Sequence, residues 1–139
     1  AVAWRDRTTK TGVSQVVVRS RSLQTKEGLR VGLSLAEVES LNGKPLIING
    51  FGWDYGGVIG SWEGGRLAPI GLTQNGGARV WFDAPRERRA QLNHGEYGSV
   101  SGDKPLSSDH PILRKLRPTI GQLDIFFGDG RCEEYFDAF

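Results

Sequence analysis

One short segment constrains the fold of this chain more than any other, because residues 33–45 carry a full set of helix signals. Ser34 is a good N-cap, and Glu37 stands three residues later, which is the spacing of a capping box. Gly43 offers the left-handed conformation that ends many helices, and Pro45 prevents continuation. Apolar residues recur on one face at helical spacing: Leu35, Val38 and Leu41. We therefore predict a short amphipathic helix from Ser34 to Gly43 that packs against another element.

The remaining apolar runs are typical of strands. Alternating or β-branched residues predict strands at 2–6, 14–20, 46–55, 58–63, 79–83, 120–127 and 131–136. Glycine turns at Gly56-Gly57 and at residues 128–130 predict two hairpins. The chain contains 20 glycines, which favours short strands joined by tight turns. A sheet of antiparallel hairpins with one or two short helices packed on one face gives an α+β fold, which is the class we predict.

A helix followed by a hairpin is expected twice along the chain. The second helix is predicted to begin at Ser108 or Asp109, to bury the apolar residues of segment 112–116, and to end before Pro118. Before it, residues 84–108 are polar and show no convincing period. We predict a long polar loop there, and loops of this length are usually functional or mobile. The chain of 139 residues has the size of a single domain, spanning 1–139.

Charge and composition exclude several classes of function. The formal net charge of +2 is too small for a nucleic-acid-binding domain, so we predict no nucleic-acid partner. No apolar run approaches the roughly 20 residues that a membrane-spanning helix needs. Cys132 is the only cysteine, so an internal disulfide is excluded and the fold rests on packing. Ala1 is a small residue of the kind that removal of a secretory signal leaves, which favours a secreted or periplasmic location.

The predicted helix also resembles a known motif. The residues that carry the resemblance are Gly32, Ser34, Val38, Leu41, Gly43 and Pro45. They are similar to the entry of bacterial envelope modules of the β-lactamase-inhibitor-protein-like kind, which run into strands with Trp and Tyr nearby, here Trp53 and Tyr55. Residues 51–57 also look similar to uncharacterised exported bacterial domains, and Asn42 departs from the pattern where a second apolar residue is common. The resemblance implies a non-catalytic module that binds other proteins, and it carries over no functional residue.

Four aromatic residues fall on the first predicted hairpin: Phe51, Trp53, Tyr55 and Trp62. A two-residue turn would place Phe51 opposite Trp62. It would also place Trp53 opposite Gly60, so that the rings share one side of the sheet. One interpretation is a platform that stacks a sugar or anchors a protein. The other, which we favour, is a sheet face buried under the helix, with Tyr55 beside the turn reaching solvent.

The sequence shows no recognisable catalytic or metal-binding set. His94 and His110 lack the short ligand spacing of a zinc site, so we predict no metal ligand. Cys132 falls in a predicted strand, which favours a buried thiol over a nucleophile. Calcium binding by the acids of the polar loop or by residues 128–130 stays open, although the ligand order of an EF-hand is absent. We predict no catalytic residue and no cofactor.

Basic residues cluster at 86–89 and at 114–117, where they would form a solvated face or meet an acidic partner. The predicted contact surface combines the loop with exposed aromatics: Tyr55, Trp62, Arg86, Arg88, Arg89, His94 and Tyr97. We predict an exported, non-catalytic domain that recognises a protein or polysaccharide partner. An alternative is a small hydrolase or lyase that takes its acid and base from His94 and the loop carboxylates. A third is an oligomeric domain that uses strand 2–6 as a sheet edge, and the sequence leaves the oligomeric state open.

Overall fold

Two antiparallel sheets and four short α-helices form within residues 1–73 and 75–128, which the computed structural model describes, and this confirms the predicted α+β class. The larger sheet has the strand order β1 (Val2–Asp6), β2 (Thr11–Val18), β7 (Thr119–Phe127) and β5 (Gly76–Asp83). The smaller sheet has the order β4 (Ile59–Ser61), β3 (Ile47–Asn49) and β6 (Pro105–Ser107). The helices are α1 (Leu35–Asn42), α2 (Arg86–Ala90), α3 (His94–Ser99) and α4 (Pro111–Leu116), with a 3₁₀ turn at Ala68–Ile70.

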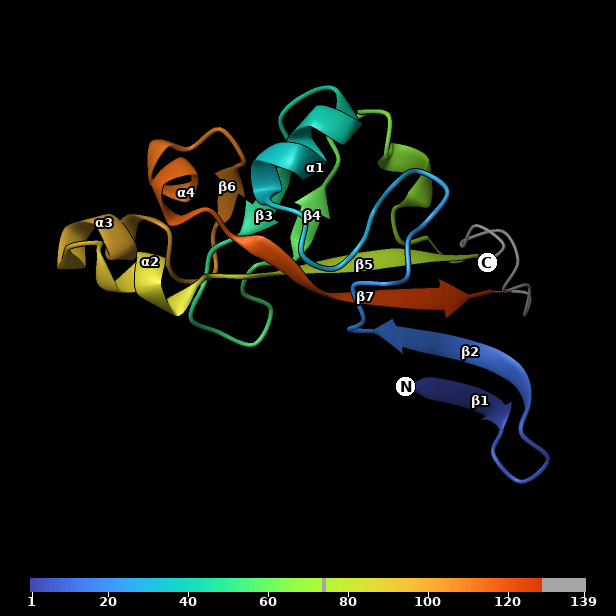
Figure 1. The fold of residues 1–139 in the computed structure, drawn as a ribbon. Coiled ribbons are helices and arrows are strands. Elements are labelled where there is room, and N and C mark those ends of the chain that lie inside the picture. The colour runs from blue at the N-terminus through green and yellow to red at the C-terminus, as the bar shows by residue number, and fades with distance from the viewer. Residues whose placement is uncertain (74, 129–139) are drawn as a thin grey trace.

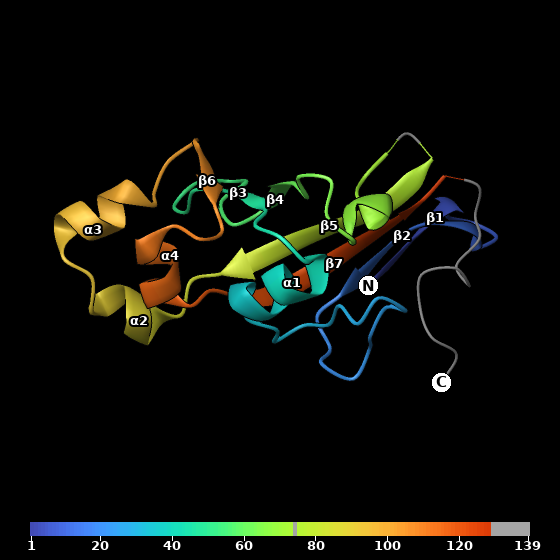
Figure 2. The ribbon, with the colours of Figure 1, turned by 90° about the horizontal axis from the view of Figure 1, so that it is seen from above.

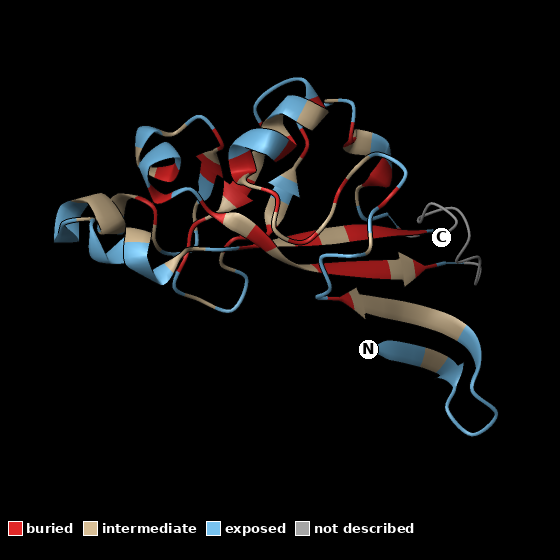
Figure 3. Cartoon of the chain, in the orientation of Figure 1, coloured by how far each residue is buried: buried red, intermediate tan, exposed pale blue. Residues whose placement is uncertain are grey.

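Most of the described elements outside the larger sheet cover one of its faces. Figure 1 shows α1, α4 and the smaller sheet on that face, and Figure 2 shows α1 lying across β5 and β7. On β5, Val80 and Phe82 are buried, whereas Arg79 and Trp81 alternate with them and are half-buried, as the strand period predicted. Burial is concentrated in β5 and β7 and is lost toward β1 (Figure 3). The core therefore lies between the larger sheet and the layer above it.

Helix α1 confirms the strongest prediction from the sequence. The Ser34 side chain accepts a hydrogen bond from the Glu37 N–H, and the Glu37 carboxylate accepts one from the Ser34 N–H, completing the capping box. Gly43 ends the helix in the left-handed conformation with φ 79°. Leu35 and Val38 are buried, so the apolar face packs into the core as expected.

The strand predictions at 2–6, 79–83 and 120–127 correspond to β1, β5 and β7. β7 is the central strand, because it pairs with β2 on one side and with β5 on the other. The second hairpin was expected to continue through residues 128–130 into 131–136. Residues 129–139 lie outside the described part of the chain, and the predictions for Cys132 and for the partner strand lie there too.

The predicted register of the first hairpin is wrong. β3 and β4 do pair, but Ile47 lies opposite Ser61, and residues 50–58 form a loop instead of a tight turn. Phe51 leaves the hairpin, since its N–H donates to the carbonyl of Val100 at 2.8 Å. The carbonyl of Gly57 accepts a hydrogen bond from the Phe82 N–H at 2.8 Å. These hydrogen bonds join the loop to distant parts of the chain. They cannot be predicted from the sequence of the hairpin alone.

Segment 84–108 is not a structureless loop, because it contains α2, α3 and β6. β6 pairs with β3 at the edge of the smaller sheet. The helix after it, α4, is capped by His110, whose Nδ1 accepts from the Ile112 N–H at 3.1 Å, and not by Ser108 or Asp109. Helix α4 ends at Leu116, ahead of Pro118 as predicted. None of the described helices has both the length and the apolar character that crossing a membrane requires.

Candidate functional site

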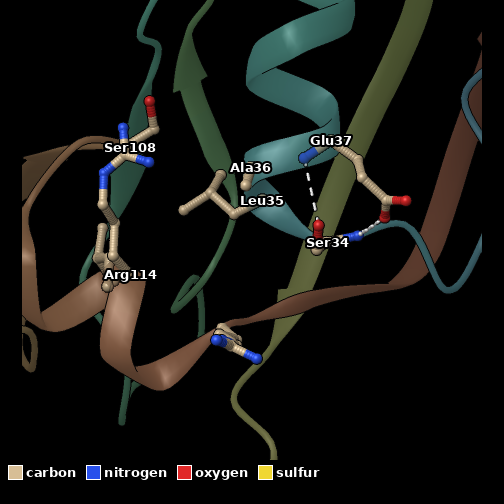
Figure 4. A pocket seen from close by; sticks show the side chains of 8 residues that line it. Ser34, Leu35, Ala36, Glu37, Ser108 and Arg114 are labelled. Carbon is tan, nitrogen blue, oxygen red and sulfur yellow. Dashed lines mark hydrogen bonds between the residues drawn. The ribbon is translucent and has the colours of Figure 1, made fainter.

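A hollow of about 570 Å³ lies between the first turn of α1 and helix α4. Its polar side chains, apart from Arg117, already bond to one another or to close neighbours, and Figure 4 shows the Ser34 and Glu37 pair. These capping-box bonds from Ser34 lower the pKa of the Glu37 carboxyl. Glu39 accepts a hydrogen bond from Ser108 and pairs with Arg114 at 3.2 Å. Because these groups join α1 to its neighbours, we assign this hollow a structural role.

A second region gathers most of the predicted contact residues. Two open hollows of about 540 and 370 Å³ meet there, because Arg89 and Tyr97 line both. The first lies between the loop that joins β3 to β4 and the end of β5, and the second lies between α2 and α3. We call the following seven residues the Arg89–Tyr97 surface: Trp53, Asp83, Arg86, Arg89, Asn93, His94 and Tyr97.

Helices α2 and α3 present these side chains in pairs. Arg86 and Arg89 are three residues apart on α2, and His94 and Tyr97 are three apart on α3, so each pair shares one helix face. The Arg89 guanidinium carbon lies 5.9 Å from the centre of the Tyr97 ring, which is a cation–π contact. β5 ends at Asp83, only three residues before α2 begins, so the rigid sheet carries this helix. The two helices therefore bring the arginines against an aromatic ring.

Three contacts anchor helix α3. The Asn93 side chain accepts from the Glu96 N–H at 2.8 Å, and the Glu96 carboxylate accepts from the Asn93 N–H at 2.9 Å, which makes a second capping box. Lys115 of α4 pairs with the same carboxylate at 2.7 Å. Hydrogen bonds from Lys115 and Asn93 lower the pKa of Glu96. Lys104 adds a hydrogen bond to the carbonyl of Gly98 at 2.9 Å.

A row of aromatic rings adjoins this surface and continues onto the face of the larger sheet opposite α1. The Trp53 ring meets Tyr55 edge-on at 5.7 Å, and Tyr55 stacks on Trp81 at 6.1 Å with the ring planes 20° apart. The Trp53 indole N–H donates to the carbonyl of Gly50 at 2.8 Å. The Trp81 indole N–H donates to the buried carboxylate of Asp124 at 2.9 Å. Hydrogen bonds at both ends thus fix the orientation of the row.

Charge on the Arg89–Tyr97 surface is not neutralised from within. The ion pairs in the described part of the chain are Arg114 with Glu39 and Lys115 with Glu96. Neither Arg86 nor Arg89 is engaged by a carboxylate of the described residues, and both side chains are exposed. Two of the three cations in the cluster at 114–117 therefore serve the fold, whereas the arginines of α2 remain available.

The structure brings together four of the seven predicted contact residues: Arg86, Arg89, His94 and Tyr97. Tyr55 adjoins them through Trp53 and is 50% exposed, so it reaches solvent. Trp62 was a wrong choice for the surface, because it is only 8% exposed and belongs to the core. Arg88 lines neither hollow, because it lies between Arg86 and Arg89 in sequence and so points off their shared helix face.

The predicted contact surface did not include Trp53, Asp83 or Asn93. Trp53 was favoured as part of a buried sheet face. Asp83 is the last residue of the predicted strand 79–83, and the packing of the β3–β4 loop against β5 makes a hollow beside it. Asn93 carried a usable local signal, because Asn93 followed by Glu96 has capping-box spacing. That signal would have placed a helix at the position of α3.

The hydrolase alternative needs a carboxylate partner for His94. The His94 imidazole is exposed at the edge of an open hollow, and the described residues give it no hydrogen-bond or ion-pair partner. Across residues 1–73 and 75–128, no three His, Cys, Asp or Glu side chains gather closely enough to hold a metal ion. Within the described part of the chain, His94 therefore has no assembled acid–base partner.

No protein-family model, curated protein or solved structure matches this chain. The resemblance of residues 32–45 to bacterial envelope modules therefore stays a prediction. The candidate site is identified from its own geometry and chemistry.

Proposed function

We propose that the chain is an exported, non-catalytic binding domain that contacts its partner through the Arg89–Tyr97 surface. The supporting observation is that Arg86 and Arg89, which pair with no carboxylate of the described residues, line two joined hollows that also contain Tyr97 and Trp53, and that Arg89 contacts the Tyr97 ring. Arg, Tyr and Trp are the residues in which binding energy is most often concentrated. A guanidinium without an internal carboxylate partner can bind a ligand without first losing an ion pair.

The rigidity of the surface supports the same function. The Trp53 ring is held by its hydrogen bond to Gly50, and α3 is held by the capping box and by Lys115. Side chains that are already ordered lose little conformational entropy when a partner binds. The resemblance of residues 32–45 to exported binding modules points in the same direction, and it is the basis for proposing export. No observation favours the hydrolase over this function, because His94 has no carboxylate beside it.

The test compares charge-matched double variants. The domain is immobilised and exposed to a bacterial envelope extract, and the retained protein and polysaccharide are both quantified. Arg86→Ser with Arg89→Ser should reduce retention at least about tenfold, which corresponds to about 1.4 kcal/mol. Lys44→Ser with Arg66→Ser removes the same charge from two exposed positions outside the surface and should leave retention unchanged. Equal retention by both variants, with unaltered circular dichroism, would show that the proposed surface is not the binding site.

A further inference from the structure

We propose that the ligand of the Arg89–Tyr97 surface is a polysaccharide that carries anionic groups. In this arrangement a sugar carboxylate binds Arg86 and Arg89, and a neighbouring sugar ring lies against Trp53 and Tyr97. The inference rests on the proposed function and names the chemical class of its ligand. It is argued from the apolar content of the surface, from the placement of its rings, and from the separation of its charges.

The surface has too little exposed apolar area for the core of a stable protein interface. Such interfaces have an apolar centre within a polar rim. Among the described residues, the exposed large apolar side chains are Val2, Tyr55 and Leu72. They come from three separate parts of the chain, and only Tyr55 adjoins the Arg89–Tyr97 surface. A protein partner would therefore meet mainly charged and polar groups. A sugar needs only single ring faces and hydrogen-bonding groups, and this surface provides both.

The first hollow has the chemistry of a site for a neutral sugar ring. Trp53, Tyr97 and Asp83 line it, together with Arg89. The C–H bonds of a sugar carry partial positive charge, so they are attracted to the electron-rich face of an aromatic ring. The Asp83 carboxylate accepts hydrogen bonds from hydroxyl groups. It also offsets the positive charge of Arg89, which lines this hollow too, so an anion is less favoured here than in the second hollow.

The second hollow has the opposite charge. It is lined by Arg86, Arg89, Asn93 and His94, and no carboxylate of the described residues is among its lining groups. The planar guanidinium of Arg89 lies over the Tyr97 ring, and this contact leaves the N–H groups at its edge free to donate. A guanidinium binds a carboxylate through two parallel hydrogen bonds, a geometry that a lysine cannot reproduce. The anionic group of the ligand is therefore assigned to this hollow.

The acidic and basic side chains are distributed differently in the two hollows. Asp83 lines only the first and Arg86 lines only the second, whereas Arg89 and Tyr97 line both. A chain of linked sugars that places an uncharged ring in the first hollow and an acidic sugar in the second satisfies both ends. Glu87, the acidic residue of α2, lines neither hollow. Sulfated sugars present similar oxygens to a guanidinium, so the experiment includes both kinds of anion.

Isothermal titration calorimetry with four polysaccharides tests the inference. The probes are partly methyl-esterified polygalacturonate, which offers both uncharged and acidic rings and is called polygalacturonate below, its fully methyl-esterified form, dextran sulfate and unmodified dextran. Polygalacturonate should bind, and esterification should weaken its binding at least about tenfold, because it removes the charge and leaves the chain in place. Dextran should not bind. Raising the salt concentration should weaken the binding of polygalacturonate, because exposed charges are screened.

Neighbouring arginines supply the matched control. Arg89→Gln should weaken polygalacturonate binding at least about tenfold. Arg88→Gln removes the same charge from the same helix but lies outside both hollows, and it should change affinity less than about twofold. Equal effects of the two substitutions would overturn the inference, because binding would then reflect general attraction of a polyanion. Binding of dextran sulfate without binding of polygalacturonate would overturn the assignment of a carboxylated ligand.

The envelope-extract experiment separates this inference from the proposed function. If the arginine-dependent retained material is protein and no polysaccharide binds, then the ligand class is wrong and the binding surface stands. If retention does not depend on Arg86 and Arg89 at all, then the proposed function fails together with the inference.

Discussion

Asn42 joins three segments at the end of α1, and this explains why an amide stands where an apolar residue was expected. It is 1% exposed, and its amide donates to the carbonyls of Lys44 and Trp62 at 3.1 and 3.0 Å, while its oxygen accepts from the Leu67 N–H at 3.1 Å. Asn42→Ala leaves these groups unpaired, so we expect a loss of about 1–3 kcal/mol in unfolding free energy, measured with urea. Ser40→Ala, at an exposed position of the same helix, should change it by less than about 0.5 kcal/mol. Equal losses would contradict the role of the amide.

Gly57 is required by both its backbone and its surroundings. Its φ is 78°, and a Cβ at this position would collide with the carbonyl of Phe82. Gly64 has φ 69° and no atom within 4 Å of the same position, so it isolates the backbone effect. Gly64→Ala should cost about 1–2 kcal/mol in unfolding free energy, and Gly57→Ala should cost about 1–3 kcal/mol more. Thermal or urea unfolding of the two variants measures the difference. Equal losses of unfolding free energy would mean that the loop at 50–58 shifts to make room for the added Cβ without cost.

Elements with a complete local signal could be predicted from the sequence, and those that depend on distant partners could not. Helix α1 has its cap, apolar face and terminating glycine in one continuous segment. The loop at 50–58 was misread as a hairpin, because two glycines in sequence do not reveal that Phe51 bonds to Val100 or that Gly57 bonds to Phe82. Helix α3 lacks fully buried residues, so no apolar period marked it. Its stability depends on capping and on packing against α4.

The contact between α3 and α4 should make this part of the molecule sensitive to acid. Hydrogen bonds from Lys115 and Asn93 lower the pKa of Glu96 below its ordinary value of 4.5. A carboxyl with a lowered folded-state pKa contributes stability that is fully present above its unfolded-state pKa and is lost as the pH falls through the folded-state pKa. We expect Glu96→Gln to reduce the loss of stability between pH 6 and pH 3, measured by urea unfolding at each pH. Glu87→Gln on α2 is the control, and an unchanged pH dependence for Glu96→Gln would contradict the expectation.

At the scale of the whole molecule, the candidate site is formed where the helices and the β3–β4 loop pack beside the larger sheet. The sequence therefore predicted several residues of the site but not the elements that carry them. Arg86, Arg89, His94 and Tyr97 were expected on one flexible loop, and the structure places them on two helices fixed to the larger sheet and to α4. Trp62 was assigned to the same surface because the predicted hairpin register, which is wrong, put it opposite Phe51 on the side of the sheet that carries Tyr55. Residue type thus identified candidates for binding, while long-range pairing decided which of them share a surface.

The layered arrangement also predicts where the native state opens most easily. β7 is paired on both sides and carries the buried residues Leu123 and Ile125. Among the described strands, β1 pairs with β2 alone, and it is mostly exposed (Figure 3). Local opening needs less free energy where few apolar contacts are lost. Amide hydrogen exchange should therefore be slowest in β7 and much faster in β1, at low protein concentration. An edge strand without a partner is a template for pairing with another chain. If β1 is instead as well protected as β7, and if this protection and the light scattering both rise with protein concentration, then a second copy of the chain covers this sheet edge.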